Sequence, residues 1–477
     1  MPYQYDAVVI GSGPNGLCAA IELARGGKQV LLVEALEQIG GGLRSGEVLQ
    51  RGVITDVCSA VHPMGVLSPF MRQLPLEEHG LNWVFPKFSA AHPVDGGRAV
   101  ILSRSLEATA AQLGSDAKAY RRLIGPFLDR PELLLEDVLG PLSIPRRPIM
   151  FARFGLRAFR SALGLGRGVF KNPDARALFA GCSAHSILPL DKFFTAAMGV
   201  MFLLTGHMTD WPVARGGSGA IAEALASYFR SLGGEIRTGS EVRSLADLPE
   251  ARAYLFDLAP KQLAFIAGDA LPAGYRARLL RYNYGPAVFK LDYVLRGQIP
   301  WSAPDCADAS TVHVGGSMEE IARSERAAWR GEISDAPFVM VCQQSHFDPT
   351  RAPVGQHTGY AYCHVPFGSE VDMTAAIERQ IERFAPGFRD QVLERRATFP
   401  GDIARYNGAC IGGAITGGAA DITQLFTRPV ARLNPYTTPN PRLFLCGAST
   451  PPGGGVHGMC GYHAARTVLG RFRSAKV

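Results

Sequence analysis

Residues 5–44 read YDAVVIGSGPNGLCAAIELARGGKQVLLVEALEQIGGGLR, and this stretch decides the fold. An apolar run ends at Ile10, and three glycines follow it at once in G-x-G-x-x-G spacing, namely Gly11, Gly13 and Gly16. The next residues repeat apolar side chains at helical spacing, and Gly26 begins a glycine pair that ends the helix. A second apolar strand, 30–33, then ends on Glu34. The stretch therefore predicts a complete βαβ unit.

Each part of this unit has a physical role if a dinucleotide binds there. Gly11 permits a tight turn, Gly13 lets the backbone approach a pyrophosphate, and Gly16 allows close packing of helix on strand. The helix N-terminus faces the phosphates with free N–H groups, and the Glu34 carboxylate accepts hydrogen bonds from ribose hydroxyls. The predicted contacts in this unit are Gly11, Ser12, Gly13, Pro14, Asn15, Gly16, Glu34 and Ala35.

A second glycine-rich turn, residues 40–44, follows Glu34 closely and ends on Arg44. In physical terms, a guanidinium on a glycine-rich loop is a second phosphate clamp. Together with the first turn it resembles the flavoprotein amine oxidoreductases, in which this arginine reaches the FAD pyrophosphate. The resemblance implies non-covalent FAD rather than NAD as the cofactor. The contacts it implies here are Gly41, Gly42, Leu43 and Arg44.

A glycine-rich turn at 216–219 leads into a helix with one apolar face, and a strand is expected from Glu235 to Val242. In the family this unit ends at a residue whose backbone contacts the adenine, which corresponds to Val242 here.

The segment from Arg442 contains Gly453, Gly455 and Gly458 in the same glycine spacing, but no strand and acid follow it, so a second Rossmann unit is not expected. It resembles the terminal flavin-binding signature of phytoene dehydrogenase-like proteins. The flavin contacts that this implies are Gly447, Ala448, Gly455, Val456, His457 and Gly458.

The fold class expected is α/β. A Rossmann-like FAD-binding domain of the glutathione reductase type is intertwined with an α+β substrate domain that has an antiparallel sheet and a helical lid. We expect the FAD-binding domain to comprise 1–66, 212–275 and 436–477. The substrate domain would comprise 67–211 and 276–435, with the lid at about 140–210. Strand patterns support the second domain, and one of them, within 282–295, alternates like a half-buried strand.

The composition of the chain argues against several classes of protein. The chain of 477 residues is 47% hydrophobic and 19% charged, which is typical of a globular protein. Its nine cysteines are scattered and form no C-x-x-C pair, which disfavours a disulfide relay or a zinc site, and no metal is expected. No signal peptide and no apolar run long enough for a membrane span are visible, so a cytoplasmic protein is expected.

Two histidines are candidate catalytic groups beside the flavin. His457 lies inside the terminal glycine loop, and His62 lies in a segment whose family equivalent passes near the isoalloxazine. Neutral imidazole can give or take a proton near physiological pH. The competing interpretation is a histidine that is hydrogen-bonded inside the core or packs within the loop.

The resemblance implies an FAD-dependent oxidoreductase similar to carotenoid and retinoid desaturases and saturases. Such a protein acts on carbon–carbon bonds of an apolar, isoprenoid-like substrate, by desaturation, saturation or isomerisation, with oxygen or a quinone as electron acceptor. One alternative is a flavin amine oxidase, for which Lys290 is the candidate lysine beside the flavin. Another alternative is a binding protein for prenylated partners that shares the fold.

The segment 145–171 carries seven basic residues and no acidic one, interleaved with apolar side chains. Ala152, Leu156, Phe159 and Leu163 repeat at helical spacing. This pattern indicates a basic amphipathic helix that makes peripheral contact with an anionic membrane, and no nucleic-acid partner is expected. A helix packed on its own domain with a solvated basic face is the alternative.

Overall fold

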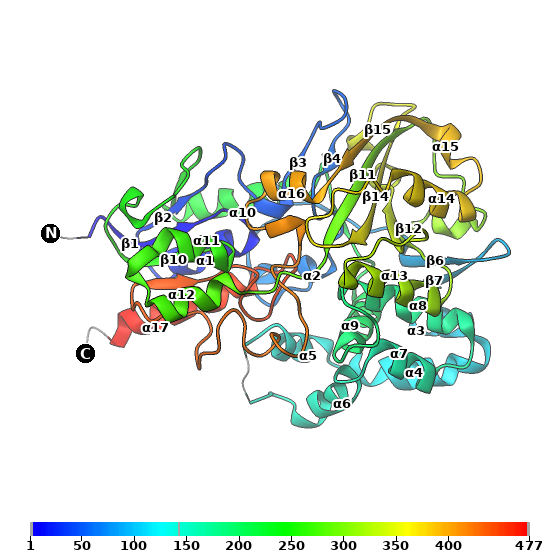
Figure 1. Cartoon of the computed structure of the whole chain (residues 1–477), viewed down its shortest axis with the longest axis horizontal. Helices are drawn as coiled ribbons and strands as arrows, with labels where there is room; N and C mark the ends of the chain where they lie inside the picture. The colour runs from blue at the N-terminus through cyan, green and yellow to red at the C-terminus, as the bar shows by residue number, and fades with distance from the viewer. Residues whose placement is uncertain (1–2, 142–143, 475–477) are drawn as a thin grey trace.

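The computed structural model describes residues 3–141 and 144–474, which form two sheets with helices packed around them (Figure 1). The first sheet is parallel throughout, in the order β16-β10-β1-β2-β9. Its strands are β1 (Tyr5–Ile10), β2 (Val30–Val33), β9 (Glu235–Arg237), β10 (Ala251–Phe256) and β16 (Leu443–Leu445). The predicted βαβ unit is thus confirmed as the centre of a larger sheet that collects strands from three distant parts of the chain.

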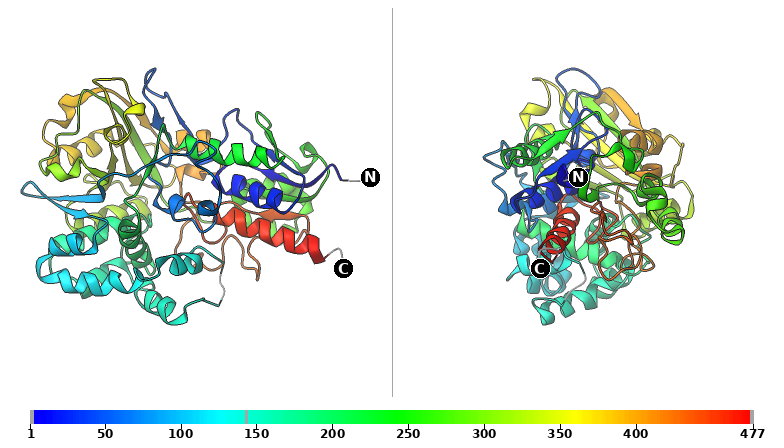
Figure 2. Two further views of the ribbon diagram at one scale, coloured as in Figure 1. Left: turned by 180° about the vertical axis from the view of Figure 1, so that it is seen from behind. Right: turned by 90° about the vertical axis from the view of Figure 1, so that its left-hand side faces the viewer.

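Both faces of this sheet are covered by helices. Ala7 and Val9 of β1 pack in the cluster that contains helices α1 (Pro14–Arg25), α10 (Gly219–Ser231) and α17 (Met459–Ser474). Val8 and Ile10 face the cluster of α11 (Pro260–Ala267) and α12 (Ala273–Leu280). Burial on both sides explains the continuous apolar run of β1. The described ends of the chain, β1 and α17, lie at the same end of the molecule (Figure 2).

The edge strand β9 is shorter than predicted. It ends at Arg237 because Gly239 adopts a φ of 60°, which breaks the extended conformation. Val242 therefore lies in a loop and not at the end of a strand.

The second sheet has seven strands in the order β15-β11-β14-β13-β12-β6-β7, and its neighbours are antiparallel except for β12 and β6. Its strands are β6 (Phe88–Val94), β7 (Arg98–Leu102), β11 (Ala287–Leu295), β12 (Ala309–Val314), β13 (Val339–Cys342), β14 (His357–Val365) and β15 (Val392–Thr398). Two-residue strands form two small ladders: β3 (Ser45–Gly46) with β4 (Thr55–Asp56), and β5 (Trp83–Val84) with β8 (Val213–Ala214).

The expectation that β11 is half-buried is wrong, because all nine of its residues are buried. Helix α14 (Thr374–Phe384) packs in the cluster on one face of the strand. On the other face, Val288 packs with Ile403 of α16 (Pro400–Tyr406), and Lys290 pairs with Asp292. The alternation of polar and apolar residues therefore reflects a buried ion pair rather than a solvent-facing side.

A helical segment lies below the second sheet in Figure 1. Its helices are α3 (Leu106–Ala111), α4 (Ala117–Ile124), α5 (Pro131–Val138), α6 (Pro148–Ala158), α7 (Ala162–Val169), α8 (Pro173–Ala184) and α9 (Thr195–Met208). The remaining helices are α2 (Pro63–Val66), α13 (Met318–Arg330) and α15 (Phe388–Gln391). Among the described residues, no helix is both long enough and apolar enough to cross a membrane.

The single helix suggested by the spacing in 145–171 is two helices, α6 and α7. The chain breaks between them because the Ser161 hydroxyl accepts a hydrogen bond from the Gly164 N–H and caps a new helix. Leu163, expected on the same face as Leu156, is consequently buried while Leu156 is exposed.

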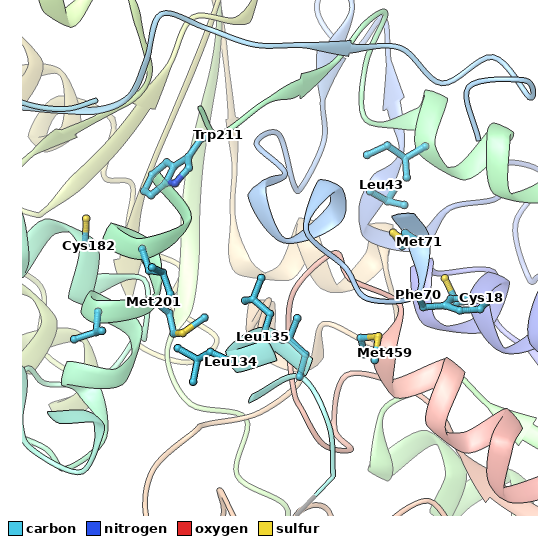
Figure 3. Close-up of a cluster of buried hydrophobic side chains, with 14 of the residues drawn as sticks. Cys18, Leu43, Phe70, Met71, Leu134, Leu135, Cys182, Met201, Trp211 and Met459 are labelled. Carbon is cyan, nitrogen blue, oxygen red and sulfur yellow. The ribbon is translucent and has the colours of Figure 1, made fainter. Parts of the chain in front are cut away.

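One apolar core joins the first sheet to the helical segment. Figure 3 shows Cys18, Phe70 and Met459 on the side of the first sheet, and Leu135 and Trp211 on the helical side, all within this one cluster. The sheets and helices are therefore packed as a continuous body around the cavity described next.

Candidate functional site

A cavity of 1350 Å³ runs from the carboxyl edge of the first sheet into the helical segment. We call its two ends the glycine end, lined by Gly11, Ser12, Gly13, Pro14 and Asn15, and the helical end, lined by Phe154, Phe159, Met198, Met201 and Phe202. Parallel sheets bind ligands outside the carboxyl ends of their strands, so this is where the fold would place a dinucleotide.

The turn after β1 leaves no room for larger side chains. Gly11 has a φ of 96°, and a Cβ on Gly16 would lie 2.0 Å from the Gly11 carbonyl oxygen. A Cβ on Gly13 would lie 2.6 Å from the Asp257 carboxylate. The glycines are therefore required by a positive φ and by close backbone approach, as the spacing predicts.

Glu34 and Arg44 meet beside this turn. The Ser12 N–H donates to Glu34 Oε2 over 3.0 Å, and Arg44 Nη2 lies 3.3 Å from Glu34 Oε1. Arg44 also donates to the carbonyls of Gln38 and Tyr406, and its guanidinium lies 5.0 Å from the Tyr406 ring centre. Both side chains are buried and held in place before any ligand arrives.

Most of the predicted contacts line the cavity. They are Gly11, Ser12, Gly13, Pro14, Asn15, Glu34, Ala35, Gly41, Gly42, Arg44, His62, Val242, Gly447, Ala448, Gly455, Val456 and His457. The cavity wall does not include Gly16, Leu43 or Gly458. Gly16 packs on Gly11, Leu43 is a fully buried core residue, and a Cβ on Gly458 would lie 2.2 Å from the Cys18 sulfur. These three residues shape the backbone around the site.

His62 has one ring nitrogen engaged and one without a partner. The Ser218 hydroxyl donates its single proton to the Ser59 carbonyl over 2.7 Å, so His62 Nε2 donates to Ser218 Oγ, also over 2.7 Å. The Nδ1 atom of His62 is then an acceptor, and it has no partner in the described part of the chain. Burial lowers the pKa of His62 to about 4, so the ring is neutral at pH 7.

His457 has its ring engaged by its own loop. Its Nδ1 accepts the Met459 N–H over 3.0 Å at the start of α17, and the Ser68 hydroxyl donates to its carbonyl oxygen. Burial lowers the pKa of this imidazole to about 4. The geometry suits a neutral ring that holds the glycine loop against the cavity.

A buried arginine clamp supports the β3–β4 hairpin, which precedes His62 in the chain. Arg351 is fully buried, and it lies 3.0 Å from both Asp56 Oδ2 and Asp348 Oδ2. Asp56 further accepts the Ser218 N–H over 2.7 Å. Burial alone would raise the pKa of Asp56, but the Arg351 guanidinium and the Ser218 N–H bring it below its ordinary value. Arg351, Asp56 and Asp348 form this clamp, and the sequence does not reveal it because Asp56 and Arg351 are 295 residues apart.

Asp257 is a site residue that the sequence reasoning missed. It follows β10 directly, lines the cavity, and accepts the Gly16 N–H over 2.8 Å. Burial, opposed by that hydrogen bond, together with the Glu34 charge, raises its pKa to about 7. An acid at the carboxyl end of a strand next to β1 was the signal that could have found it.

We expect FAD affinity to fall as the pH rises through about 7, because Asp257 then becomes charged beside the phosphates. One proton is linked to binding, so the dissociation constant should rise by up to about tenfold per pH unit in that range. Fluorescence titration of the apoprotein with FAD measures this. Asp257→Asn should remove the dependence and Asp6→Asn should keep it. Tighter binding above pH 7 would contradict the assignment.

The cavity fits a bound FAD. Six buried polar atoms on its wall have no partner among residues 3–141 and 144–474, namely Asn15 Oδ1, His62 Nδ1, Asp137 Oδ2, Ser186 Oγ, Tyr406 Oη and Ser449 Oγ. Native proteins rarely leave such atoms unpaired, and a large polar ligand supplies the partners. The described residues contain no group of three His, Cys, Asp or Glu side chains arranged for a metal ion.

The model of the family "Flavin containing amine oxidoreductase" matches residues 15–261. The mouse protein "Pyridine nucleotide-disulfide oxidoreductase domain-containing protein 2" is 26% identical, covering 99% of this chain and 94% of its own. A "Phytoene desaturase (lycopene-forming)" from a Paracoccus species is 24% identical, and the match covers 96% of this chain and 96% of that protein. The solved structure of putrescine oxidase bound to putrescine superposes with a TM-score of 0.64 at 16% identity, covering 98% of this chain and 99% of that one.

Proposed function

The chain belongs to the flavin containing amine oxidoreductases, and from this membership we propose that it desaturates, saturates or isomerises carbon–carbon bonds of an apolar, isoprenoid-like substrate. It is an FAD-dependent oxidoreductase. When bound, FAD supplies a hydride acceptor or donor. The chain's own residues bind the cofactor, orient the substrate and exclude water. We propose that the FAD is held without a covalent bond, and that His62 and His457 contact the flavin.

One observation carries the substrate class: the helical end of the cavity is apolar. Most of its wall is apolar and includes Phe151, Phe154, Phe159, Phe194, Met198, Met201 and Phe202, beside the polar His185 and Ser186. Aromatic and thioether side chains suit a polyene or terpenoid because they offer dispersion contacts without hydrogen-bond partners. A phytoene desaturase among the relatives agrees with this substrate class.

Amine oxidation is the second candidate, because two tyrosines lie on the cavity wall. The rings of Tyr360 and Tyr362 are 5.8 Å apart and nearly perpendicular, an arrangement that can hold a cation. However, the Lys290 ammonium already lies 4.5 Å from the Tyr360 ring centre and pairs with Asp292. Lys290 is not part of the cavity wall. These contacts favour the carbon–carbon reaction over the amine reaction.

We propose oxygen or a quinone as the electron acceptor. The part of the chain that the structure describes contains one parallel sheet of the dinucleotide type. That sheet would be taken by FAD, so NADPH should reduce the flavin poorly.

Anaerobic flavin absorbance tests the function. The purified protein is mixed with terpenoid polyenes, quinols and amines, and the reduced protein is mixed with the same polyenes. We expect an isoprenoid to bleach the oxidised flavin or to reoxidise the reduced flavin. Bleaching by amines alone would overturn the proposal in favour of amine oxidation.

We further propose that the outer surface of α6 contacts an anionic membrane. Exposed apolar side chains cluster around this helix, with Ile149 74% exposed, Leu156 77% and Phe159 55%. Phe159 and Phe194, whose ring centres are 4.4 Å apart, also line the cavity, so the exposed patch continues into its helical end. An apolar substrate would then pass from the lipid to the cavity without crossing water.

Only some of the basic residues around α6 form ion pairs with acidic residues of the protein. Arg146 pairs with Glu136, and Arg167 with Glu319. In the described ranges no ion pair forms at Arg147 or Arg153, and both are exposed. Each basic residue near an anionic surface contributes about 1 kcal/mol, in addition to the apolar burial.

Liposome flotation should show binding that needs anionic lipid and weakens with salt. Ile149→Glu with Leu156→Glu should abolish flotation, because the apolar contact is lost and negative charge is added. Arg147→Glu with Arg153→Glu should reduce it at low salt. Leu433→Glu, at a fully exposed leucine elsewhere, is the control and should float like the wild type. Flotation by the first double variant at the wild-type level would contradict the assignment.

A further inference from the structure

Three histidines form a row that leads from the cavity wall into the second sheet. His185 follows α8 and lines the cavity, and its Nε2 lies 2.9 Å from Nε2 of His313 on β12. His92 on β6 lies next, with its ring centre 6.5 Å from that of His313, and its Nε2 is 2.7 Å from the Gly316 carbonyl oxygen. His313 and His92 are both completely buried. We call these three residues the histidine row.

Gly181 packs closely against two rings of this row. A Cβ on Gly181 would lie 2.8 Å from His313 Nδ1 and 3.0 Å from His92 Nδ1. Both nitrogens are buried, and neither has a hydrogen-bond partner among the described residues. Gly181 lies inside α8, where ordinary helical geometry does not require glycine. Glycine is needed here because a larger side chain would clash with both rings. Since two neighbouring buried nitrogens without partners are rare, a water molecule bonded to both would satisfy them and link the row.

The hydrogen bond to Gly316 determines which nitrogen of His92 carries the proton. A carbonyl oxygen only accepts, so His92 Nε2 carries a proton, and in the neutral ring its Nδ1 is a lone pair. His185 and His313 share a single proton between their Nε2 atoms. Each ring can thus take a proton at one nitrogen and pass one on from the other.

The electrostatic surroundings favour charge at the far end of the row. Burial, with a smaller effect of the nearby His364, lowers the pKa of His185 to about 3; burial and the two neighbouring histidines hold the pKa of His313 far below its ordinary range. Burial lowers the pKa of His92 to about 4, but the Gly316 carbonyl and the carboxylates of Asp174 and Glu320 act in the opposite direction. A transient positive charge is therefore least unfavourable on His92.

Other titratable groups pack against the row. His364 Nδ1 lies 2.8 Å from the Glu325 carboxylate, and Phe338 contacts both His364 and His313. His185 itself stacks on Phe202 with ring centres 4.2 Å apart and meets the edge of Trp211. Aromatic contacts thus hold the His185 ring at the helical end of the cavity.

We propose that His185 exchanges the proton that accompanies hydride transfer, and that His313 and His92 relay it. This inference rests on the proposed carbon–carbon reaction. In desaturation one substrate carbon gives a hydride to the flavin, and the neighbouring carbon loses a proton to His185 Nδ1. The electron pair of that second C–H bond becomes the new C=C bond.

The proton then moves along the row. The Nε2 proton of His185 passes to His313 Nε2, and His313 Nδ1 gives its proton through the bridging water to His92 Nδ1. His92 then holds the proton only until oxygen or a quinone reoxidises the flavin. The proton returns along the row to the cavity, and the acceptor takes up the hydride together with this proton, so protons and electrons balance; saturation of a double bond runs the same path in reverse. His185 is the catalytic residue, and His313 and His92 act through it.

The first test needs no substrate. Nitrogen-15 histidine spectra of the FAD-loaded protein should show a strongly downfield N–H proton shared between two imidazoles. His313→Phe should remove this signal and Gly181→Ala should shift it, with FAD retained in both. Absence of the shared proton in the wild type would overturn the relay, whatever the substrate proves to be.

The second test uses rapid flavin reduction by the substrate. His185→Gln should slow reduction by about 10² to 10⁴, the range for loss of a general acid or base, while FAD binding is unchanged. His79→Gln is the matched control, since His79 bonds to Ser227 away from the cavity wall, and it should react like the wild type. Wild-type reduction by His185→Gln would overturn the proposal. A failure of the proposed function appears separately, as bleaching by amines alone.

Discussion

Arg351→Leu is expected to lower the free energy of unfolding by about 3–5 kcal/mol, the range for removing one partner of a buried ion pair. The substitution leaves the carboxylates of Asp56 and Asp348 without their shared cation, and both are tied to other backbone groups in the interior. Total stabilities are about 5–15 kcal/mol, so much of the fold's margin would be lost. Thermal unfolding followed by flavin fluorescence measures the shift.

The matched control is Arg243→Leu. Arg243 also pairs with an acid, Glu241, but its side chain is 81% exposed. Solvent screens such a pair, so the thermal transition of the Arg243→Leu variant should coincide with that of the wild type. If the two variants melted alike, Arg351 would not act as a clamp between the β3–β4 hairpin and the segment that joins β13 to β14.

Glu34→Arg is expected to purify without FAD. The carboxylate that would accept ribose hydroxyls is lost, and each such charge-assisted bond contributes roughly 1.5–3 kcal/mol, or about ten- to a hundredfold in affinity. The new guanidinium would also lie beside Arg44, whose present partner is Glu34. The ratio of flavin to protein absorbance after gel filtration gives the occupancy.

Glu37→Arg controls for the change in charge, because Glu37 is exposed three residues further on. It should retain FAD. Circular dichroism must show that Glu34→Arg is folded, and Glu34→Gln, which keeps an acceptor oxygen, should lose less affinity. Full occupancy in Glu34→Arg would contradict the role assigned to this acid.

Some parts of the site could be predicted from the sequence because residues close together in the chain determine their structure. The turn from Gly11 to Gly16, the acid after β2 and the second glycine turn lie within 40 residues, and periodicity with glycine spacing identifies them. The glycine loop before α17 was likewise recognisable.

The long-range parts could not be predicted in this way. Asp257 meets Gly16 only after β10 pairs with β1, and His185 meets His313 only after α8 packs on the second sheet. Nothing within a short window distinguishes His185 and His313 from ordinary core residues, and the only local sign of Asp257 is its place at the end of a strand. The same reason explains the correction to β11, which is covered by elements from elsewhere in the chain. The correction to β9 has a local cause, because Gly239 ends the strand through its positive φ.

The parallel sheet has a consequence for the order in which the protein matures. Strand β16 pairs with β10, and α17 lies so close to α1 that a Cβ on Gly461 would be 1.8 Å from the Asn15 carbonyl oxygen. Both elements are translated more than 400 residues after β1. Domains tend to fold from the N-terminus during synthesis, but this sheet must wait for its last strand. We therefore expect translation intermediates that lack β16 and α17 not to bind FAD, so that cofactor loading follows the synthesis of α17.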